Sequence, residues 1–303
     1  MNDILGLLWE VLFAPFADFA FMRRALVATL ALSLSAAPLG VLLTLRRMSL
    51  LGDALSHAVL PGVAIGYMVA GLSLGAMALG GVLAGMLVAA IAGAVSRFTT
   101  LKEDASLAAI YLVALALGVI LISNHGTQLD LLHILFGSAL GVDHDGLILV
   151  ATVSSVSVLA LAGLYRGLVL ESFDPVFLNA KRHAGRGTWG SWGSWVWQQS
   201  FLMLVVVNLV AGFQTLGTLM AVGLMMLPAV SARLWHDTLP AQLLNASAQA
   251  AMAGVAGLLL SYHFDTPSGP TIIACAGALY STSLLLAPGG WLPRWRSTPH
   301  RVA

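Results

Sequence analysis

Long apolar runs recur along the whole chain and constrain its fold more than any other feature. A helix needs about 20 mostly apolar residues to cross the roughly 30 Å hydrocarbon layer of a membrane. Nine runs approach or reach this length, and they cover approximately residues 25–45, 49–71, 75–96, 105–123, 147–166, 197–213, 216–234, 244–262 and 270–287. The sequence therefore predicts an all-α, polytopic membrane protein with eight or nine transmembrane helices in one domain over residues 25–288.

Two further apolar stretches do not suit a full span. Leu131–Gly141 is too short to cross and is predicted to form a half-helix that dips into the membrane or covers its outer face. Residues 1–24 are interrupted by Glu10, Pro15 and Asp18, which predicts an interfacial segment. Acidic residues also stand where a secretory signal would have basic ones, so a cleaved signal is not expected.

Composition excludes several other classes of protein. With 9% charged and 59% hydrophobic residues and a net charge of +1, the chain lacks the polar surface of a soluble protein and the basic patch of a nucleic-acid-binding one. We therefore expect this chain to be surrounded by membrane lipid. The single Cys275 excludes a disulfide scaffold and a thiolate-cluster metal site. The sequence contains no G-x-x-x-x-G-K-[ST], H-E-x-x-H or G-x-S-x-G motif, so this chain is not expected to hydrolyse ATP or to be an enzyme.

The positions of the basic residues predict the orientation. If nine helices alternate, 12 of the 14 Lys and Arg residues fall on the side of the C-terminus, and only Arg23 and Arg24 fall on the other. Because Lys and Arg are retained in cytoplasmic loops, residues 289–303 are expected to form a cytoplasmic tail. The outer loops then carry acidic and imidazole side chains, which either attract a divalent cation or are ordinary polar loop residues: His125, Asp130, His133, Asp143, His144, Asp145, His263 and Asp265.

One ionisable pair lies well inside an apolar run. Asp53 and His57 are four residues apart, which places them on one helix face about 5–6 Å apart at Cβ. A charged side chain at membrane depth costs about 2.5–3.5 kcal/mol on insertion scales, so it indicates a function. A carboxylate and an imidazole suit Zn(II), Mn(II) or Fe(II). The alternative is a structural hydrogen bond that neutralises two polar groups.

Proline predicts two interruptions of the helices. Pro61 and Gly62 follow His57 closely, and broken helices near the membrane centre are where transporters build their binding sites. Pro228 predicts a second break in the run over residues 216–234.

The stretch around the ionisable pair also resembles a known family. Residues 46–62 read Arg-Arg-Met-Ser-Leu-Leu-Gly-Asp-Ala-Leu-Ser-His-Ala-Val-Leu-Pro-Gly, which is similar to the signature of permease subunits of bacterial ABC importers for zinc, manganese or iron. Leu135–Gly141, Val222–Arg233 and Leu260–Pro270 follow in the same order as in that family, so the resemblance covers about residues 21–288.

This resemblance implies a homodimeric or paired component of the bacterial cytoplasmic (inner) membrane. Its partners would be two cytoplasmic ATPase subunits and an extracytoplasmic metal-binding protein. Asp53 and His57 would line the path of the ion, which is cargo rather than a permanent cofactor. We expect zinc first, because of the His residues in the outer loops, with manganese or iron as alternatives.

The resemblance further implies a cytoplasmic segment, about residues 170–190, that couples the chain to its ATPase. Phe173, Asp174 and Pro175 match the family pattern, whereas Val176 replaces its Glu. Lys181, Arg182 and Gly185 lie further along this coupling segment, with Arg182 where the family has Gly. Two rival hypotheses remain open: a secondary transporter driven by a proton or sodium gradient, and a membrane scaffold or sensor with a structural Asp–His pair.

Overall fold

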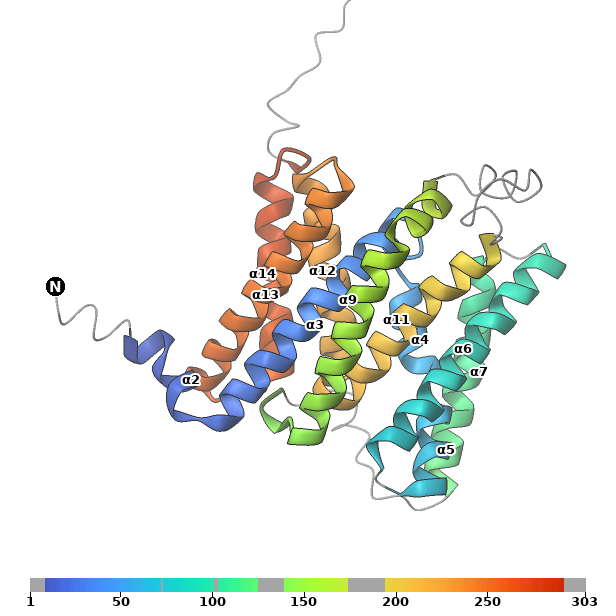
Figure 1. The fold of residues 1–303 in the computed structure, drawn as a ribbon, viewed down its shortest axis with the longest axis horizontal. Coiled ribbons are helices and arrows are strands. Elements are labelled where there is room, and N and C mark those ends of the chain that lie inside the picture. Colours follow the sequence, from blue (N-terminus) through green and yellow to red (C-terminus); the bar gives the residue numbers. More distant parts are fainter. Residues whose placement is uncertain (1–8, 72, 101–102, 125–138, 174–193, 292–303) are drawn as a thin grey trace, which may run out of the picture.

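The computed structural model describes residues 9–71, 73–100, 103–124, 139–173 and 194–291. Within these ranges nine helical segments are long and apolar enough to cross a membrane, as the sequence predicts, and they run between two ends of a bundle (Figure 1). The elements are α2 (Ala14–Asp18), α3 (Ala20–Leu45), α4 (Leu51–Ala58), α5 (Leu60–Ala70), α6 (Leu74–Phe98), α7 (Glu103–Asn124), η1 (Ala139–Gly141), α9 (His144–Phe173), α11 (Ser194–Leu216), α12 (Thr218–Trp235), α13 (Leu239–Phe264) and α14 (Ser268–Leu286).

Several helices extend beyond the apolar runs that predict them. Helix α3 begins at Ala20, so Arg23 and Arg24 belong to the first long helix rather than preceding it. Helix α9 continues to Phe173, seven residues past its predicted end. Hydrogen bonding continues a helix through polar residues at the membrane surface, where hydropathy no longer reports it. Of the predicted half-helix, only Ala139–Gly141 is described and forms a 3₁₀ turn, and residues 131–138 lie outside the described ranges.

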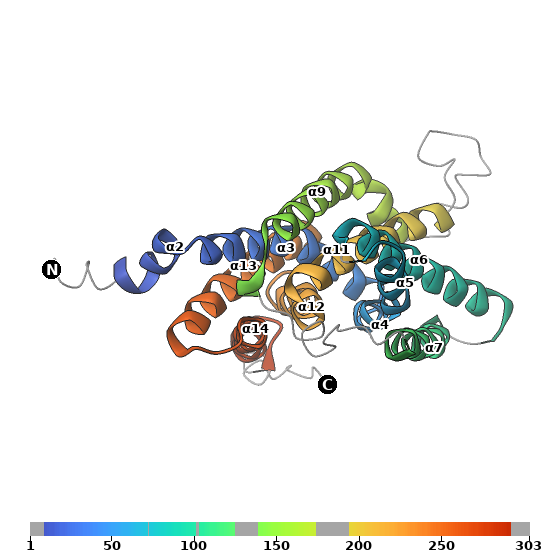
Figure 2. The ribbon, with the colours of Figure 1, turned by 90° about the horizontal axis from the view of Figure 1, so that it is seen from below.

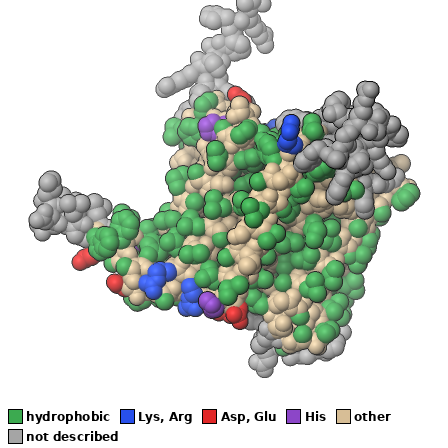
Figure 3. Space-filling model, in the orientation of Figure 1, with side chains coloured by type: hydrophobic (Ala, Val, Ile, Leu, Met, Phe, Trp, Pro, Cys, Tyr) green, Lys and Arg blue, Asp and Glu red, His purple; other side chains and the backbone are tan. Residues whose placement is uncertain are grey.

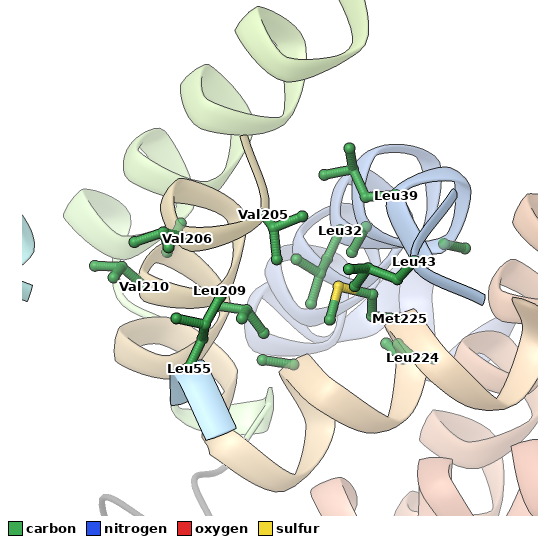
Figure 4. Close-up of a cluster of buried hydrophobic side chains, with 14 of the residues drawn as sticks. Leu32, Leu39, Leu43, Leu55, Val205, Val206, Leu209, Val210, Leu224 and Met225 are labelled. Atoms are coloured by element: carbon green, nitrogen blue, oxygen red, sulfur yellow. The ribbon is translucent and has the colours of Figure 1, made fainter. Parts of the chain in front are cut away.

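Helix α3 is the central element of the bundle. It packs against α9, α11, α12 and α13, and nearly every residue of its second half is buried. Figure 4 shows Leu39 and Leu43 of this helix facing a cluster that includes Leu209 of α11 and Met225 of α12. Lipid offers no hydrophobic drive between helices, so close packing of such side chains holds the bundle together.

The remaining helices flank this core on two sides. Helices α5, α6 and α7 pack against one another beside α4, whereas α13 and α14 pack against α12 (Figure 2). The α5–α6 crossing is close because Gly62 faces Gly80, and a Cβ added to either glycine would collide with the backbone carbonyl of the other. Small residues allow this approach between membrane helices.

The second span is broken near the place that the sequence indicates. Helix α4 ends at Ala58 and α5 begins at Leu60, with Val59 between them. Pro61 therefore lies in the first turn of α5, and it has no N–H to donate to the carbonyl of His57 four residues earlier. Gly62 is not part of the break, because it lies inside α5 at the crossing with α6.

The second predicted break does not occur. Helix α12 runs from Thr218 to Trp235 through Pro228, which is buried within it. Pro38 is likewise inside the unbroken α3. Membrane helices tolerate an internal proline when neighbouring helices hold the two sides in line, and α12 has α3, α11, α13 and α14 around it.

Candidate metal site between α4 and α12

Helix α4 carries the predicted ligand pair, and its packing fixes where that pair points. Leu51, Ala54, Leu55 and Ala58 are buried, and Leu55 lies beside Leu209 of α11 (Figure 4). The absence of a side chain at Gly52 lets α4 close on α12, since a methyl group there would meet the Met225 side chain. The opposite face of the helix is left for Asp53 and His57. Figure 1 shows α4 between the two ends of the bundle.

The two side chains approach each other without forming a hydrogen bond. The Nε2 atom of His57 lies 3.8 Å from Oδ1 of Asp53, beyond the distance at which such a bond forms. The Asp53 side chain is 62% exposed and that of His57 is 25% exposed. The other imidazole nitrogen, Nδ1 of His57, is buried without a hydrogen-bond partner. Asp53 and His57 therefore lie on one face of α4, as their spacing predicts. They do not form the structural hydrogen bond that was the alternative to a metal site.

Both side chains line a pocket of about 320 Å³. Its walls come from three helices and comprise Asp53, Ser56 and His57 of α4, Thr218, Leu219, Val222 and Gly223 of α12, and Ile273 of α14. The Ser56 hydroxyl donates a 2.7 Å hydrogen bond to the backbone carbonyl of Asp53, within the turn of α4 that carries Asp53 and His57. An apolar pocket with a few convergent polar groups is the usual form of a ligand site.

Sequence reasoning did not find the far wall of this pocket. Val222 and Gly223 begin the family-like stretch Val222–Arg233, and that was the signal available in the sequence. Most side chains of this wall are apolar, so no ionisable residue in the sequence marks it as part of a site. Their role is to bound the space beside Asp53 and His57.

The predicted outer-loop residues that the structure describes lie at separate places. Asp143 accepts a 2.8 Å hydrogen bond from the Gly146 N–H at the start of α9, and with Asp145 it lines a separate pocket of about 530 Å³ near α6. His144 is exposed at the start of α9. Figure 3 shows Arg or Lys, acidic and His side chains along the lower edge of the molecule in that view. His125, Asp130 and His133 lie outside the described ranges.

His263 and Asp265 lie at the C-terminal end of α13 instead. The His263 ring packs edge-on against Tyr262, and Asp265 takes a left-handed backbone conformation with a φ of 49°. Over the part of the chain that the structure describes, no group of three or more His, Cys, Asp or Glu side chains is placed to hold a metal ion. Attraction of a divalent cation by the outer-loop residues thus stays a prediction.

The predicted coupling segment is described only at its start. Phe173 is the last residue of α9, and Asp174, Pro175, Lys181, Arg182 and Gly185 lie outside the described ranges. Helix α9 therefore carries the chain directly into this segment.

Comparisons with known proteins agree with the resemblance noted in the sequence. The family model described as "ABC 3 transport family" matches residues 18–287. The manganese transport system membrane protein MntC of Halalkalibacterium halodurans is 32% identical over 94% of each chain. A probable iron transport system membrane protein of Haemophilus influenzae is 30% identical, over 88% of this chain and 94% of its own.

A solved structure has the same architecture. The PsaBC complex from Streptococcus pneumoniae with a Fab includes a chain that superposes with a TM-score of 0.77 at 28% identity, over 94% of this chain and 98% of that one. The family match spans the nine apolar segments and includes the α4 motif and the α12 wall of the pocket. By sequence and by fold, this chain belongs to the ABC 3 transport family, as a permease component of metal-ion ABC transporters.

Proposed function

We propose that this chain is the membrane subunit of an ATP-driven importer of divalent manganese. The observation that carries the proposal is the placement of Asp53 and His57 on the open side of α4, facing the pocket against α12. The 3.8 Å gap between Nε2 and Oδ1 leaves both atoms free to bind one cation. Two ligands from one chain make a weak site, which suits transport because the ion must leave again.

The proposal assigns the remaining coordination to groups outside this chain. The Asp53 carboxylate is more than half exposed, so its free side is accessible to water, to the delivering protein or to a second copy. In a homodimer, two copies that meet at this pocket would supply two carboxylates and two imidazoles. Such a set supplies four oxygen and nitrogen ligands, which are ligand types that suit Mn(II), Fe(II) and Zn(II).

Manganese takes the place of zinc as the proposed cargo. Support comes from the names of the relatives, which are manganese and iron transport proteins. The expectation of zinc was based on outer-loop His residues, and the described ones are exposed and separate rather than gathered into a site. An N/O site binds Zn(II) more tightly than Mn(II) at equilibrium, so selection for manganese must come from geometry, delivery or availability.

The partners follow from the same proposal. A cytoplasmic ATPase pair would act on the coupling segment after α9, and an extracytoplasmic metal-binding protein would load the outer end. The chain would lie in a bacterial inner membrane with its C-terminus in the cytoplasm. Movement of packed helices about the pocket would then alternate its access between the two sides.

Uptake into proteoliposomes tests this function. The vesicles would contain this chain with its ATPase partner, and labelled Mn²⁺, Zn²⁺ or Fe²⁺ would be supplied on the binding protein with and without ATP at the ATPase side. We expect ATP-dependent accumulation of Mn²⁺. Accumulation that needs no ATPase and follows an imposed pH or sodium gradient would instead identify a secondary transporter.

A further inference from the structure

A buried arginine joins the end of α3 to the end of α9. The Arg46 guanidinium lies 2.7 Å from the Glu171 carboxylate, and these side chains are only 6% and 10% exposed. Its Nε donates a 3.0 Å hydrogen bond to the Ser172 hydroxyl, and a longer bond of 3.4 Å reaches the Leu168 carbonyl. The face of the Phe201 ring, on α11, covers the guanidinium at 4.2 Å. One side chain thus contacts the last turns of α9 and the side of α11.

Arg46 lies between the proposed coupling segment, through its contact with α9, and the proposed metal ligands on α4. Glu171 precedes Asp174, the first residue beyond α9, by three positions, and the proposed coupling segment continues from there. Arg46 caps α3 and starts the short connection to α4, which begins at Leu51. The proposed metal ligand Asp53 follows in the first turn of α4.

The connection between Arg46 and α4 is tightly built. The Met48 N–H donates to the Leu43 carbonyl at 3.0 Å, and the Leu51 N–H donates to the Met48 carbonyl at 3.1 Å. Arg47 has a φ of 59°, a left-handed conformation that the surrounding bonds hold in place. These bonds attach the connection to the end of α3 and to the start of α4.

The far wall of the metal pocket is attached to the same place. The Arg233 guanidinium of α12 donates a 3.4 Å hydrogen bond to the carbonyl of Thr44, two residues before Arg46. Two of the three helices that bound the pocket, α4 and α12, are therefore attached to the C-terminal end of α3. A displacement of this end relative to α9 would change the pocket from both sides.

The chemistry of the Arg46 contacts suits a positioning role better than a purely stabilising one. A buried ion pair is often no more stabilising than a well-packed apolar pair of the same volume. The planar guanidinium, by contrast, fixes the direction of each partner, because its donors form a rigid fork. Separation of α3 from α9 would break both the ion pair with Glu171 and the hydrogen bond to Ser172, so these contacts favour one arrangement of the two helix ends.

We propose that Arg46 is a positioning residue that transmits movement of the coupling segment to the metal pocket. In this mechanism the ATPase displaces the end of α9, Glu171 carries Arg46 with it, and the α3–α4 connection shifts Asp53 and His57. The inference rests on the proposed function, since it concerns the coupling of ATP hydrolysis to transport by that same pocket.

The test compares Mn²⁺ transported with ATP hydrolysed in the reconstituted full complex with Mn²⁺-loaded binding protein. The main variant is Glu171→Gln, which keeps the shape of the side chain and removes its charge. We expect its ATP hydrolysis to remain within about twofold of the wild type, while Mn²⁺ carried per ATP falls about fivefold or more. Arg46→Lys keeps the charge without the planar fork and should give a smaller fall in the same ratio.

Asp237→Asn is the matched control, because it removes an exposed carboxylate between α12 and α13 without touching these contacts. It should leave the ratio unchanged. A wild-type ratio in well-inserted Glu171→Gln and Arg46→Lys complexes would overturn the inference, as would a parallel loss of hydrolysis and transport in both. If the wild-type complex itself shows no ATP-dependent Mn²⁺ uptake, the proposed function fails instead.

Discussion

The Asp53 carboxylate and the His57 imidazole face the same pocket from consecutive turns of α4, with 3.8 Å between Oδ1 and Nε2. A pair at this distance does not form a hydrogen bond within itself, and the Asp53 side chain is 62% exposed. We expect the cost of this pair within a membrane protein to be offset by an ion that binds between the two groups. This relationship sets the first prediction.

Substitution of either ligand should stop transport. Asp53→Asn and His57→Ala are each expected to lower Mn²⁺ uptake by at least about tenfold, because removal of even an outer-shell partner typically costs a metal site 10–100-fold. Uptake of labelled Mn²⁺ per transporter in the membrane is the measurement. Asp237→Asn, which changes the same side-chain chemistry away from the pocket, should transport normally. Wild-type uptake by both pocket variants would remove the pair from the mechanism.

The break at Val59 should matter for transport more than for folding. Pro61→Ala restores an N–H that can bond to the carbonyl of His57, so α4 and α5 should tend to join into one helix. We expect lower Mn²⁺ uptake at an unchanged amount of protein in the membrane. Pro38→Ala, at a proline inside the unbroken α3, serves as the control and should affect uptake less. Equal effects of the two substitutions would show that the break has no special part in transport.

Helices α5 and α6 approach so closely at Gly62 and Gly80 that a side chain added there should destabilise the protein. Gly62→Ala places a Cβ against the backbone carbonyl of Gly80, and overpacking of this kind costs about 1–3 kcal/mol or more. The thermal unfolding midpoint of the detergent-solubilised protein should fall. Gly163→Ala on α9, where an added Cβ meets nothing, should leave that midpoint unchanged or raise it. A normal midpoint for Gly62→Ala would mean that the helices can separate at no cost.

A buried hydroxyl pair connects α12 to α14 and should contribute modestly to stability. The Ser231 hydroxyl donates a 2.7 Å hydrogen bond to that of Ser283, which in turn donates to the Leu279 carbonyl. Hydrogen bonds between membrane helices average about 0.6 kcal/mol. We expect Ser231→Ala to lower the free energy of unfolding by about that amount. In a double-mutant cycle with Ser283→Ala the two losses should be less than additive, and strict additivity would show that the bond contributes nothing.

The sequence predicts the spans well because their signal is local. Twenty consecutive apolar residues identify a crossing segment whatever its neighbours are, and the i, i+4 spacing alone places Asp53 and His57 on one face. Helix ends are predicted less well, since α9 continues past its apolar run to Phe173. The break near Pro61 is found to within two residues, because proline directly removes a backbone bond.

Features that depend on packing are not predictable in this way. Pro228 has the same local chemistry as Pro61, yet α12 continues through it, with α3, α11, α13 and α14 packed around it. Arg46 and Glu171 are 125 positions apart, so nothing local joins them, and the orientation rule treats Arg46 only as one of many basic residues. The apolar far wall of the pocket likewise has no chemical signature of its own. The metal role of Asp53 and His57 remains a prediction.

The size of the pocket has a consequence for how an ion would be recognised there. A volume of about 320 Å³ corresponds to roughly ten water molecules at about 30 Å³ each. That volume is large enough for an octahedral aqua ion with about six waters, so we expect an ion to reach the pocket still hydrated. A pocket of this size would not select cations by radius. Discrimination would then fall to ligand exchange, in which the carboxylate of Asp53 and the imidazole of His57 would replace individual waters at a rate that the metal itself determines.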